Sequence, residues 1–418
     1  MIAVLARDAN EPGEILGCRR LLFAWGLVLG LGAVCTPVLA QDPALGPHYL
    51  LYDVRAGEGF NLRRDTLLRA ALTTQLLGPG WTLVLPPFGA LPHWRDREAT
   101  VEGLPWRTFF DVDALAHVVP VIEFDEYVER QGPRVDRLLQ LDPIPMPDPL
   151  PPEPIVEPRP CNTVDAFDWH RLEGADSESV WRGAVFSSRI ELQAGQAECL
   201  GVFGPYPAIV PRLLETPGAV LVEPFEHLYW DGRYSGPQYW AIRRQLVFAE
   251  RLRVEAQRFR HAAFGGQPYL AVHLRRGDFV QAHTVPSLPE VARQLRDLQR
   301  QTGLARVFVA SDASDAELAE LRPEIDFVVY RPDPEAGWLD GEVAIIDQIL
   351  ATGGAWFIGT SPSTFSTVIM EERELAGRLP ETTWNVLCAP ASGRSGEAQG
   401  GCMVPRRPVA APIHRLGR

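Results

Sequence analysis

Short apolar runs alternate with longer amphipathic segments along most of the chain. Residues 49–52 and 81–85 are two such runs, and between them a glycine-containing loop precedes leucines and alanines with helical spacing over residues 61–77. Short apolar runs beside turn residues are typical of buried strands, and this leucine spacing is typical of a helix. Residues 48–87 are therefore predicted to form a strand–loop–helix–strand unit. Further strands are predicted at residues 118–124 and 219–222.

The same alternation returns in the second part of the chain. Apolar positions on one face predict a single long helix over residues 238–263. Alternating strands and helices favour a mostly parallel sheet that is covered on both faces. The sequence therefore predicts an α/β protein with two Rossmann-like domains facing a ligand cleft. Beyond the long helix, strands are predicted at 269–274, 306–310, 326–330 and 355–358, with helices at 288–302, 316–322, 342–352 and 367–376.

A proline-rich stretch interrupts this pattern. Residues 142–160 contain nine prolines, a composition that predicts an extended loop or insertion without regular structure. Cys161 follows directly and is a candidate to fix the end of this loop to the body of the protein.

The amino-terminal end has the features of an export signal. Two arginines, Arg19 and Arg20, precede the apolar stretch 21–35, and small residues lead to a cleavage site ending at Ala40. The stretch is shorter than the ~20 residues that a membrane-spanning helix needs. Residues 1–40 are therefore predicted to be a signal peptide, with a signal anchor as the alternative. Both place the body of the protein in a secretory or periplasmic lumen.

The cysteines outside this signal agree with an oxidising compartment. They are Cys161, Cys199, Cys388 and Cys402. Four cysteines in such a compartment predict two disulfides, for which three pairings are open. None has the Cys-x-x-Cys spacing of a zinc cluster, so no metal site is predicted from them.

Composition and charge narrow the class of protein. Hydrophobic residues make up 46% and charged residues 22% of the chain, which is ordinary for a globular protein and excludes a collagen repeat or a coiled coil. Forty basic against 53 acidic residues give a net charge of −13. Because nucleic-acid-binding proteins usually carry a basic surface, no nucleic-acid partner is predicted.

Three loops that follow predicted strands carry the candidate chemistry, since ligands bind beyond the carboxyl ends of such strands. In the first loop Gly57 and Gly59 flank Glu58. One interpretation is a tight turn with an exposed acid. The other is a carboxylate, presented by a glycine loop at the mouth of a cleft, that acts as a general base.

The second loop brings two arginines to the end of an apolar strand. Arginine presents a planar set of donors that suits a pyrophosphate. We predict that Arg276 pairs with Asp278 while Arg275 faces the ligand. His273 is either a ligand contact or a buried, hydrogen-bonded strand residue.

The third loop is rich in hydroxyl side chains. Residues 359–366 hold four of them before Phe365, more than a helix cap needs, which favours a phosphate or nucleotide site at a helix N-terminus. Asp347 follows two isoleucines on the preceding predicted helix. If buried it needs a partner, and a nucleotide base or sugar is a candidate.

Two further acidic pairs are interpreted as structural. Asp111 and Asp113 resemble the Asp-x-Asp motif that holds a metal and a sugar nucleotide in other transferases, but they open a predicted helix and fit helix N-terminal acids better. Asp312 and Asp315 are interpreted as turn and cap residues before the next helix.

At these motifs the chain resembles the GDP-fucose protein O-fucosyltransferases, most like the type-two enzymes that act on thrombospondin type 1 repeats. The resemblance extends in order, with similar spacing, from His48 to Cys402. The chain departs from the family pattern at Gly277, where a lysine is usual, and in the proline-rich segment. The matching stretches are residues 49–54, 58–65, 81–88, 120–124, 273–279, 285–288, 343–348, 357–361, 363–366 and 371–374.

The resemblance implies a GT-B glycosyltransferase fold. Residues 41–263 would form an acceptor-side domain that includes the proline-rich loop 142–160, and residues 264–418 a domain that binds GDP-fucose. It further implies fucose transfer with inversion and without a metal or other cofactor. Glu58 would be the base and Arg275 would stabilise the departing β-phosphate. The residues implied to contact the donor are Gly57, Glu58, Gly59, Phe60, Asn61, His273, Leu274, Arg275, Asp347, Thr364 and Phe365.

The resemblance also implies disulfides Cys161–Cys199 and Cys388–Cys402. The expected partners are GDP-fucose and a folded, cysteine-rich acceptor domain, in the endoplasmic reticulum lumen. After signal cleavage no membrane span is expected, and the protein is expected to be a monomer. The alternatives are a fucosyltransferase that acts on a glycan and a non-catalytic lumenal binding module.

Overall fold

The chain is described by a computed structural model that covers residues 48–388 except 56, 92–93, 96–101, 162–168, 173–179, 216–217 and 231–235. The predicted signal at residues 1–40 and Cys402 lie outside the described residues. In the part of the chain that is described, no helix is long and apolar enough to cross a membrane. The predicted domain boundaries at 40/41 and 263/264 stay predictions.

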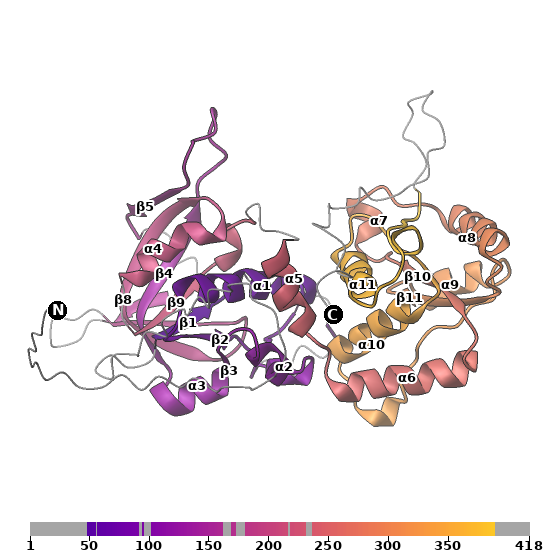
Figure 1. The fold of residues 1–418 in the computed structure, drawn as a ribbon, viewed down its shortest axis with the longest axis horizontal. Helices are drawn as coiled ribbons and strands as arrows, with labels where there is room; N and C mark the ends of the chain where they lie inside the picture. Colours follow the sequence, from indigo (N-terminus) through magenta and orange to yellow (C-terminus); the bar gives the residue numbers. More distant parts are fainter. Residues whose placement is uncertain are drawn as a thin grey trace, which may run out of the picture. The chain divides into compact units, whose positions relative to one another are not determined.

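The first part of the described chain builds one large, mainly parallel sheet (Figure 1). Its order is β3-β2-β1-β9-β4-β8-β7-β6, with β5 paired to β8. Only β5, β6 and β7 pair antiparallel with their neighbours. The strands are β1 (His48–Tyr52), β2 (Trp81–Leu85), β3 (Val121–Glu123), β4 (Arg134–Pro143), β5 (Ile155–Arg159), β6 (Trp169–Leu172), β7 (Val180–Ala184), β8 (Glu191–Phe203) and β9 (Ala219–Glu223).

A second, parallel sheet follows, in the order β11-β10-β12. Its strands are β10 (Tyr269–Leu274), β11 (Arg306–Ser311) and β12 (Trp356–Ile358). The helices of the described chain are α1 (Phe60–Leu77), α2 (Val112–Ala116), α3 (Phe124–Gln131), α4 (Val210–Leu214), α5 (Pro237–Gln245), α6 (Glu250–Phe264), α7 (Phe279–Ala282), α8 (Leu288–Thr302), α9 (Asp315–Leu321), α10 (Asp340–Gly353) and α11 (Thr364–Leu375).

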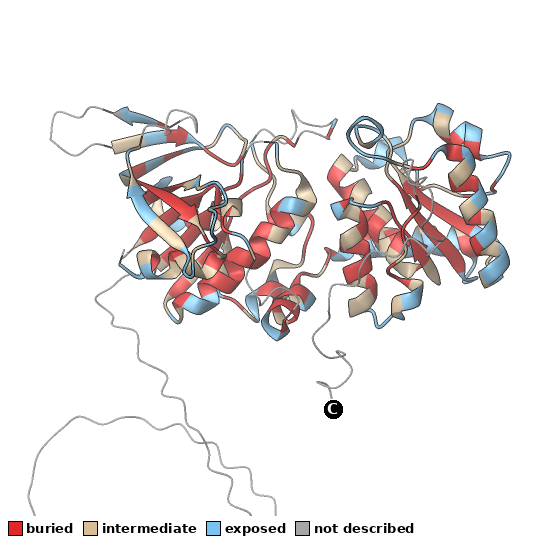
Figure 2. Cartoon of the chain, turned by 90° about the horizontal axis from the view of Figure 1, so that it is seen from above, coloured by how far each residue is buried: buried red, intermediate tan, exposed pale blue. Residues whose placement is uncertain are grey.

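Helices cover both faces of each sheet, as predicted. Alternate residues of β10 point to opposite faces: Leu270 and Val272 pack with α8 and α9, whereas Ala271 packs with α6 and α10. In β1, Leu50 packs with α1 and Leu51 with α3. Central strands such as β1, β9 and β10 are accordingly buried while the outer faces of the helices are exposed (Figure 2). The predicted α/β class is confirmed.

The predicted long helix over residues 238–263 is wrong, because it is two helices. α5 ends at Gln245 and α6 begins at Glu250. The backbone between them leaves the helix to bond the segment before α2: Asp111 N donates to Val247 O at 2.8 Å and Ala249 N donates to Phe109 O at 2.9 Å. Tertiary hydrogen bonds therefore override a continuous helical pattern.

The prediction that residues 142–160 have no regular structure is wrong at both ends. β4 continues to Pro143, and β5 pairs antiparallel with β8. Pro158 is tolerated there because a proline, which cannot donate a ladder hydrogen bond, fits a peripheral strand. The strand predicted at residues 326–330 is likewise absent, and a single bridge joins Val328 to Phe308.

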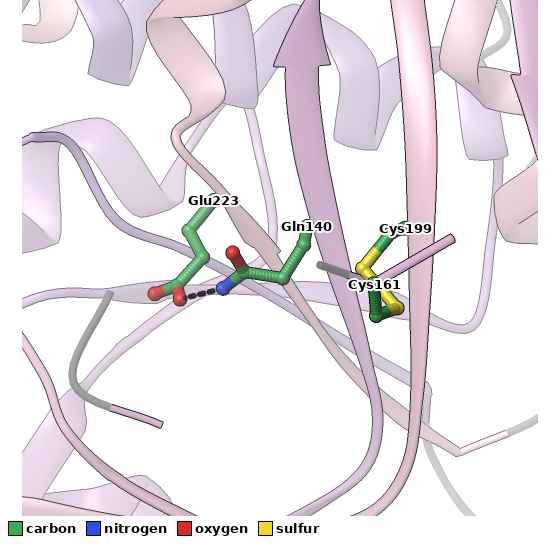
Figure 3. Close-up of a disulfide and its surroundings, with 4 residues drawn as sticks. All are labelled: Gln140, Cys161, Cys199 and Glu223. Carbon is green, nitrogen blue, oxygen red and sulfur yellow. Dashed lines mark hydrogen bonds between the residues drawn. A yellow bond between two sulfur atoms is a disulfide. The ribbon is translucent and has the colours of Figure 1, made fainter. Parts of the chain in front are cut away.

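The Cys161–Cys199 disulfide is confirmed, with Cα atoms 5.1 Å apart. It links the end of β5 to β8, whose Cys199 is the register partner of Gln140 on β4 (Figure 3). On the other side Gln140 donates to buried Glu223, which also accepts from Trp169 Nε1 at 2.6 Å. Burial raises the pKa of Glu223 well above its usual range. Because Cys402 is not described, the Cys388–Cys402 pair stays a prediction.

Candidate active site

The loop between β1 and α1 carries Glu58 at the carboxyl end of a central strand. Its backbone is held on both sides: Glu58 N donates to Arg55 O at 3.2 Å, and the Glu58 carbonyl accepts from Arg63 Nε at 3.2 Å. No hydrogen bond or ion pair from a described residue engages the Glu58 carboxylate. The carboxylate is half-buried and keeps both oxygens available to accept a proton.

The two residues after Gly59 face different surroundings. Asn61 Oδ1 accepts from Gln348 Nε2 at 3.1 Å, which connects the start of α1 to α10. The Phe60 ring lies in an aromatic cluster, stacked on Phe88 at a centroid distance of 5.0 Å. The ring therefore contributes mainly to packing, and the predicted donor contact of Phe60 stays a prediction. Its other ring neighbours are Trp94, Phe109 and Phe110.

His273, near the end of β10, is a buried strand histidine with two specific contacts. Its Nδ1 lies 2.7 Å from Ser366 Oγ on α11, and its ring stacks on Phe365 with centroids 4.4 Å apart. Burial, and then the charge of Arg275, lower the pKa of His273 to about 3. The imidazole is therefore neutral at physiological pH, and it sets the orientation of the Phe365 ring.

Thr360 ties the ends of β10 and β12 together. Its hydroxyl donates to the His273 carbonyl at 2.8 Å and accepts from Arg275 N at 3.0 Å. Its own N–H donates to Ser366 Oγ at 2.9 Å. These bonds join two strand ends and the first turn of α11 into one unit. Thr360 and Ser366 lie within the hydroxyl-rich loop, but neither was singled out as a site residue from the sequence.

The predicted pairing of Arg276 with Asp278 is wrong, because Asp278 pairs with the neighbouring arginine. Arg275, not Arg276, pairs with Asp278, at 2.6 Å, and it also pairs with Asp312, at 2.7 Å. Arg276 instead pairs with Glu317 on α9 at 2.9 Å. The side chains of successive residues diverge as the strand ends, so Arg276 reaches α9. Arg275 keeps its guanidinium beside the loops after β10 and β11.

Asp312 therefore makes contacts beyond the turn for which it was predicted. Besides pairing with Arg275, its Oδ1 accepts from Arg276 N at 2.7 Å. The cap of α9 is Ser314, whose side chain accepts from Glu317 N, and Asp315 pairs with Arg331 at the surface. A signal was present in the sequence, since Asp312 follows the strand that neighbours β10.

Of the buried side-chain oxygens on α10 that lack hydrogen-bond partners among the described residues, two belong to adjacent residues. They are Asp347 Oδ1 and Gln348 Oε1. Burial raises the pKa of Asp347 well above its usual range, and the charge of Arg331 opposes this only in part. An unpaired buried acceptor is unfavourable, so both atoms are suited to a ligand that donates hydrogen bonds.

α11 begins three residues earlier than predicted, at Thr364. Thr364 is exposed and Phe365 half-buried, and both lie in the first turn of the helix. The N–H groups of a first turn have no partner within the helix and favour an anion. This helix start, together with His273 and Arg275, gives the end of the second sheet the chemistry of a phosphate site. Leu274, the last residue of β10, is buried among α8 and α9, and its donor contact stays a prediction.

The Asp111–Asp113 pair has the structural role predicted for it. Asp111 is the N-cap of α2, and its side chain accepts from Ala114 N at 3.1 Å. Asp113 lies in the first turn of the same helix. Among the described residues, no group of three or more His, Cys, Asp or Glu side chains is arranged to hold a metal ion.

Hydrogen bonds and ion pairs connect the two regions that hold the candidate residues. Besides the bond from Gln348 to Asn61, Arg64 on α1 donates to Glu372 on α11 at 2.7 Å. Arg243 on α5 pairs with the same carboxylate at 3.0 Å. The amino-terminal end of α1, with Glu58 just before it, is thus joined to α10 and α11. No direct contact links Glu58 with Arg275.

Comparison with known proteins gives a consistent result. Residues 49–376 match the family described as GDP-fucose protein O-fucosyltransferase. The protein of Homo sapiens named GDP-fucose protein O-fucosyltransferase 2 is 38% identical over 377 residues, which cover 81% of this chain and 86% of that protein. The protein of the same name from Caenorhabditis elegans is 32% identical over 376 residues, with the same shares covered.

Solved structures agree on the fold. A crystal structure of POFUT1 in complex with GDP-fucose superposes with a TM-score of 0.56 at 18% identity, covering 83% of this chain and 99% of that chain. The structure of POFUT1 in complex with GDP gives a TM-score of 0.55 at 19% identity, with the same coverage. Identity this low shows the fold alone, and the predicted GT-B-type fold is confirmed.

Proposed function

Because this chain belongs to the GDP-fucose protein O-fucosyltransferase family, we propose that it transfers fucose from GDP-fucose to a serine or threonine hydroxyl of a protein. The observation that carries the proposal is the match over residues 49–376, which includes all three candidate loops. Each loop follows a parallel strand, where ligands bind in α/β sheets. The reaction forms a bond from the hydroxyl oxygen to the anomeric carbon and breaks the bond from that carbon to the β-phosphate.

Glu58 is the proposed general base. As the acceptor oxygen attacks, its proton passes to the Glu58 carboxylate, which none of the described residues neutralises. A positioned base contributes about 10²–10⁴-fold to such a step. Because attack comes from the side opposite the leaving phosphate, the configuration at the anomeric carbon inverts. The residues named here complete the proton transfer without a metal, and we propose that none is required.

Arg275 is proposed to neutralise the charge that develops on the β-phosphate as the bond breaks. Its guanidinium is held by Asp278 and Asp312, so contact with a phosphate requires it to exchange or share these partners. The side chain is 20% exposed, which leaves part of its donor edge accessible. A guanidinium can bind a diphosphate oxygen with two parallel hydrogen bonds.

Several polar groups suit the rest of the donor. The oxygens of Asp347 and Gln348 that lack donors are matched to the N–H groups of a guanine base or to ribose hydroxyls. The first turn of α11, with Thr364 and Phe365, suits the diphosphate. His273, neutral and stacked on Phe365, is proposed to present this helix start to the nucleotide. Gly57 and Gly59 allow the loop to approach the sugar closely.

The acceptor is proposed to be a folded, disulfide-containing protein domain such as a thrombospondin type 1 repeat. The relatives' names support a protein acceptor, and the Cys161–Cys199 disulfide supports an oxidising compartment such as the endoplasmic reticulum lumen. A sugar hydroxyl would present the same kind of attacking oxygen to Glu58, which makes a glycan acceptor the second candidate.

The test offers the protein GDP-fucose together with a folded thrombospondin type 1 repeat, the same repeat reduced and alkylated, or an oligosaccharide. Mass spectrometry then looks for the addition of one deoxyhexose, with a chelator present in a parallel set. We expect transfer to the folded repeat only, and no effect of the chelator. Transfer to the oligosaccharide alone would show that the acceptor is a glycan and not a protein domain. Inhibition by the chelator would contradict a metal-independent reaction.

A further inference from the structure

The two glycines beside Glu58 make the backbone of its loop flexible. Gly57 has a φ of +102°, and a Cβ placed on Gly57 or Gly59 would meet nothing within 4 Å. Glycines on both sides of a residue give its backbone more freedom than other neighbours would. Because no described side chain holds the Glu58 carboxylate, its direction depends on what holds the backbone of the loop.

Arg63, in the first turns of α1, supplies such a contact. Its Nε donates to the Glu58 carbonyl at 3.2 Å, its Nη2 donates to Ser187 Oγ at 3.1 Å, and its Nη1 lies 3.9 Å from Asp53 Oδ1. The rigid guanidinium thus contacts three residues at once, two in the loop after β1 and one in the turn before β8. We refer to Asp53, Glu58, Arg63 and Ser187 as the Arg63 network.

Asp53 is itself fixed where β1 ends. Its Oδ1 accepts from Val54 N at 2.7 Å and its Oδ2 accepts from Phe186 N at 2.6 Å. Its backbone N–H donates to Val222 O of the neighbouring strand β9 at 3.1 Å. A buried carboxylate needs partners of this kind, and once they are in place the group is rigid. Arg63 is therefore anchored to the centre of the first sheet.

Ser187 comes from a strained turn before β8. Phe186 and Ser187 have φ values of 61° and 52°, a region that costs non-glycine residues about 1–3 kcal/mol each. Ala90 N donates to the Ser187 carbonyl at 2.9 Å. Gly89 permits this approach, since a Cβ there would lie 2.2 Å from the same oxygen. Strain of this kind persists where the surroundings enforce it, and it clusters at functional sites.

We propose that Arg63 is a positioning residue for Glu58, held in place by Asp53 and Ser187. This inference rests on the proposed function, in which Glu58 is the base. Arg63 is only 4% exposed, so it acts through the Glu58 carbonyl and not by touching donor or acceptor. It fixes the direction from which the carboxylate meets the acceptor hydroxyl.

Arg69 provides a matched control on the same helix. It is also buried, at 7% exposed, and it pairs with Asp65 at 3.1 Å. Its guanidinium donates to Thr66 Oγ1 and to the carbonyls of Glu226 and Leu228. None of these hydrogen bonds and ion pairs is made directly to residues 57–62; the link from Arg69 to the loop is indirect, since the Glu226 carboxylate accepts from Arg55 N at 2.9 Å. The effect of replacing any buried arginine of α1 can therefore be measured apart from the effect of losing the Arg63 network.

The experiment compares Arg63→Lys with Arg69→Lys. Lysine keeps a charge beside the buried Asp53 but cannot contact three groups at once. We expect Arg63→Lys to lower kcat for transfer about 10- to 100-fold, since small misplacement of a reacting group costs this much. KM for GDP-fucose and the Kd of GDP from calorimetry should stay within about twofold, as for loss of an interaction that matters only in the transition state. Arg69→Lys should leave kcat within about threefold.

A double-mutant cycle decides whether Arg63 acts through Glu58. In a Glu58→Gln background the base is already lost, so Arg63→Lys should lower the residual rate by less than about threefold. An equal loss in both backgrounds would overturn the proposal. If Arg63→Lys does not fold, Ser187→Ala takes its place, with an expected kcat loss of about 3- to 10-fold that again vanishes in the Glu58→Gln background.

Amide hydrogen exchange keeps this test independent of the proposed function. If the wild-type protein transfers no fucose to any acceptor, the proposed function fails, but exchange over residues 57–62 still reports on the loop. Arg63→Lys should speed exchange there and Arg69→Lys should not. Unchanged protection in Arg63→Lys would show that Arg63 does not hold the loop.

Discussion

The loop after β1 and the loops after β10 and β12 all end parallel strands, but their polar groups are held differently. After β10 and β12, side chains bond one another: His273 contacts Ser366, and Arg275 pairs with Asp278 and Asp312. After β1, the contacts go to the backbone of the loop, and the Glu58 carboxylate has none from the described residues.

This difference matches the separate tasks proposed for the two regions. A site whose side chains already hold one another loses little freedom when a nucleotide diphosphate binds. A general base must instead keep its carboxylate free to accept a proton while its position stays fixed. Backbone anchoring of Glu58 through Arg63 meets both needs.

The largest effect is expected at Glu58. Glu58→Gln preserves size and removes the basic oxygen, so the transfer rate should fall about 10²–10⁴-fold. Calorimetry should give a Kd for GDP within about twofold of the wild type, because the donor side is untouched. Transfer at nearly the wild-type rate would remove Glu58 as the base.

Adjacent arginines at the end of β10 offer the next comparison. Arg275→Ala should lower kcat about 10²–10³-fold, the usual cost of losing one donor to a developing anion. Arg276→Ala removes the ion pair with Glu317 and should leave kcat within about threefold, because this partly exposed pair contributes mainly to stability. Steady-state kinetics of both variants test this. Equal losses of kcat in the two variants would show that the different ion pairs of Arg275 and Arg276 have no consequence for transfer.

A stability change remote from both regions is expected at the disulfide. Cys161 and Cys199 are separated by 38 residues, and replacing both with serine should lower the free energy of unfolding by about 2–4 kcal/mol. Neither cysteine contacts the candidate loops, so kcat at low temperature should stay within about twofold of the wild type. Urea unfolding and kinetics on the same sample measure both quantities. A large fall in kcat in a variant that still folds would show that the outer strands contribute to catalysis.

A smaller, pH-dependent effect is expected at His273. Burial, and then the charge of Arg275, lower the pKa of this residue to about 3. An unfolded histidine has a pKa of about 6.5, so between these values the unfolded state binds more protons and stability falls as pH decreases. This group should therefore cost about 2 kcal/mol of stability between pH 7.5 and pH 5.

His273→Gln should lose this part of the pH dependence. Burial raises the pKa of Asp53 to about 6, which acts in the opposite direction, but Asp53 is present in both proteins and cancels. Urea unfolding of the two proteins at both pH values gives the difference. An identical pH dependence in wild type and variant would mean that His273 is not buried in its neutral form.

Much of the fold could be predicted because it depends on local patterns. The apolar runs that became β1, β2 and β10 are buried strands, and the spacing over residues 61–77 is helical in α1. The break between α5 and α6 could not be predicted, since hydrogen bonds to Phe109 and Asp111, far away in sequence, cause it. β5 was missed for a similar reason, because its pairing with β8 outweighs its prolines.

Within the candidate site, the sequence indicated which loops matter but not how their side chains pair. Arg275 and Arg276 are adjacent and chemically equivalent, and only the direction of each side chain at the strand end assigns Asp278 to one and Glu317 to the other. Arg63 lies in the matching stretch 58–65 but was not singled out, and Ser187 gave no signal, since 124 residues separate it from Arg63. Contacts of this kind exist only once the sheet has formed.

The most direct test of this division of tasks is a crystal structure of the protein with GDP bound. We expect the Arg275 guanidinium to lie within hydrogen-bond distance of a β-phosphate oxygen, with its contact to Asp278 or Asp312 exchanged. We expect equally that the Glu58 carboxylate does not touch the nucleotide and that Arg63 still holds the Glu58 carbonyl. A diphosphate bound away from Arg275, with both of its carboxylate partners still in place, would contradict this division of tasks.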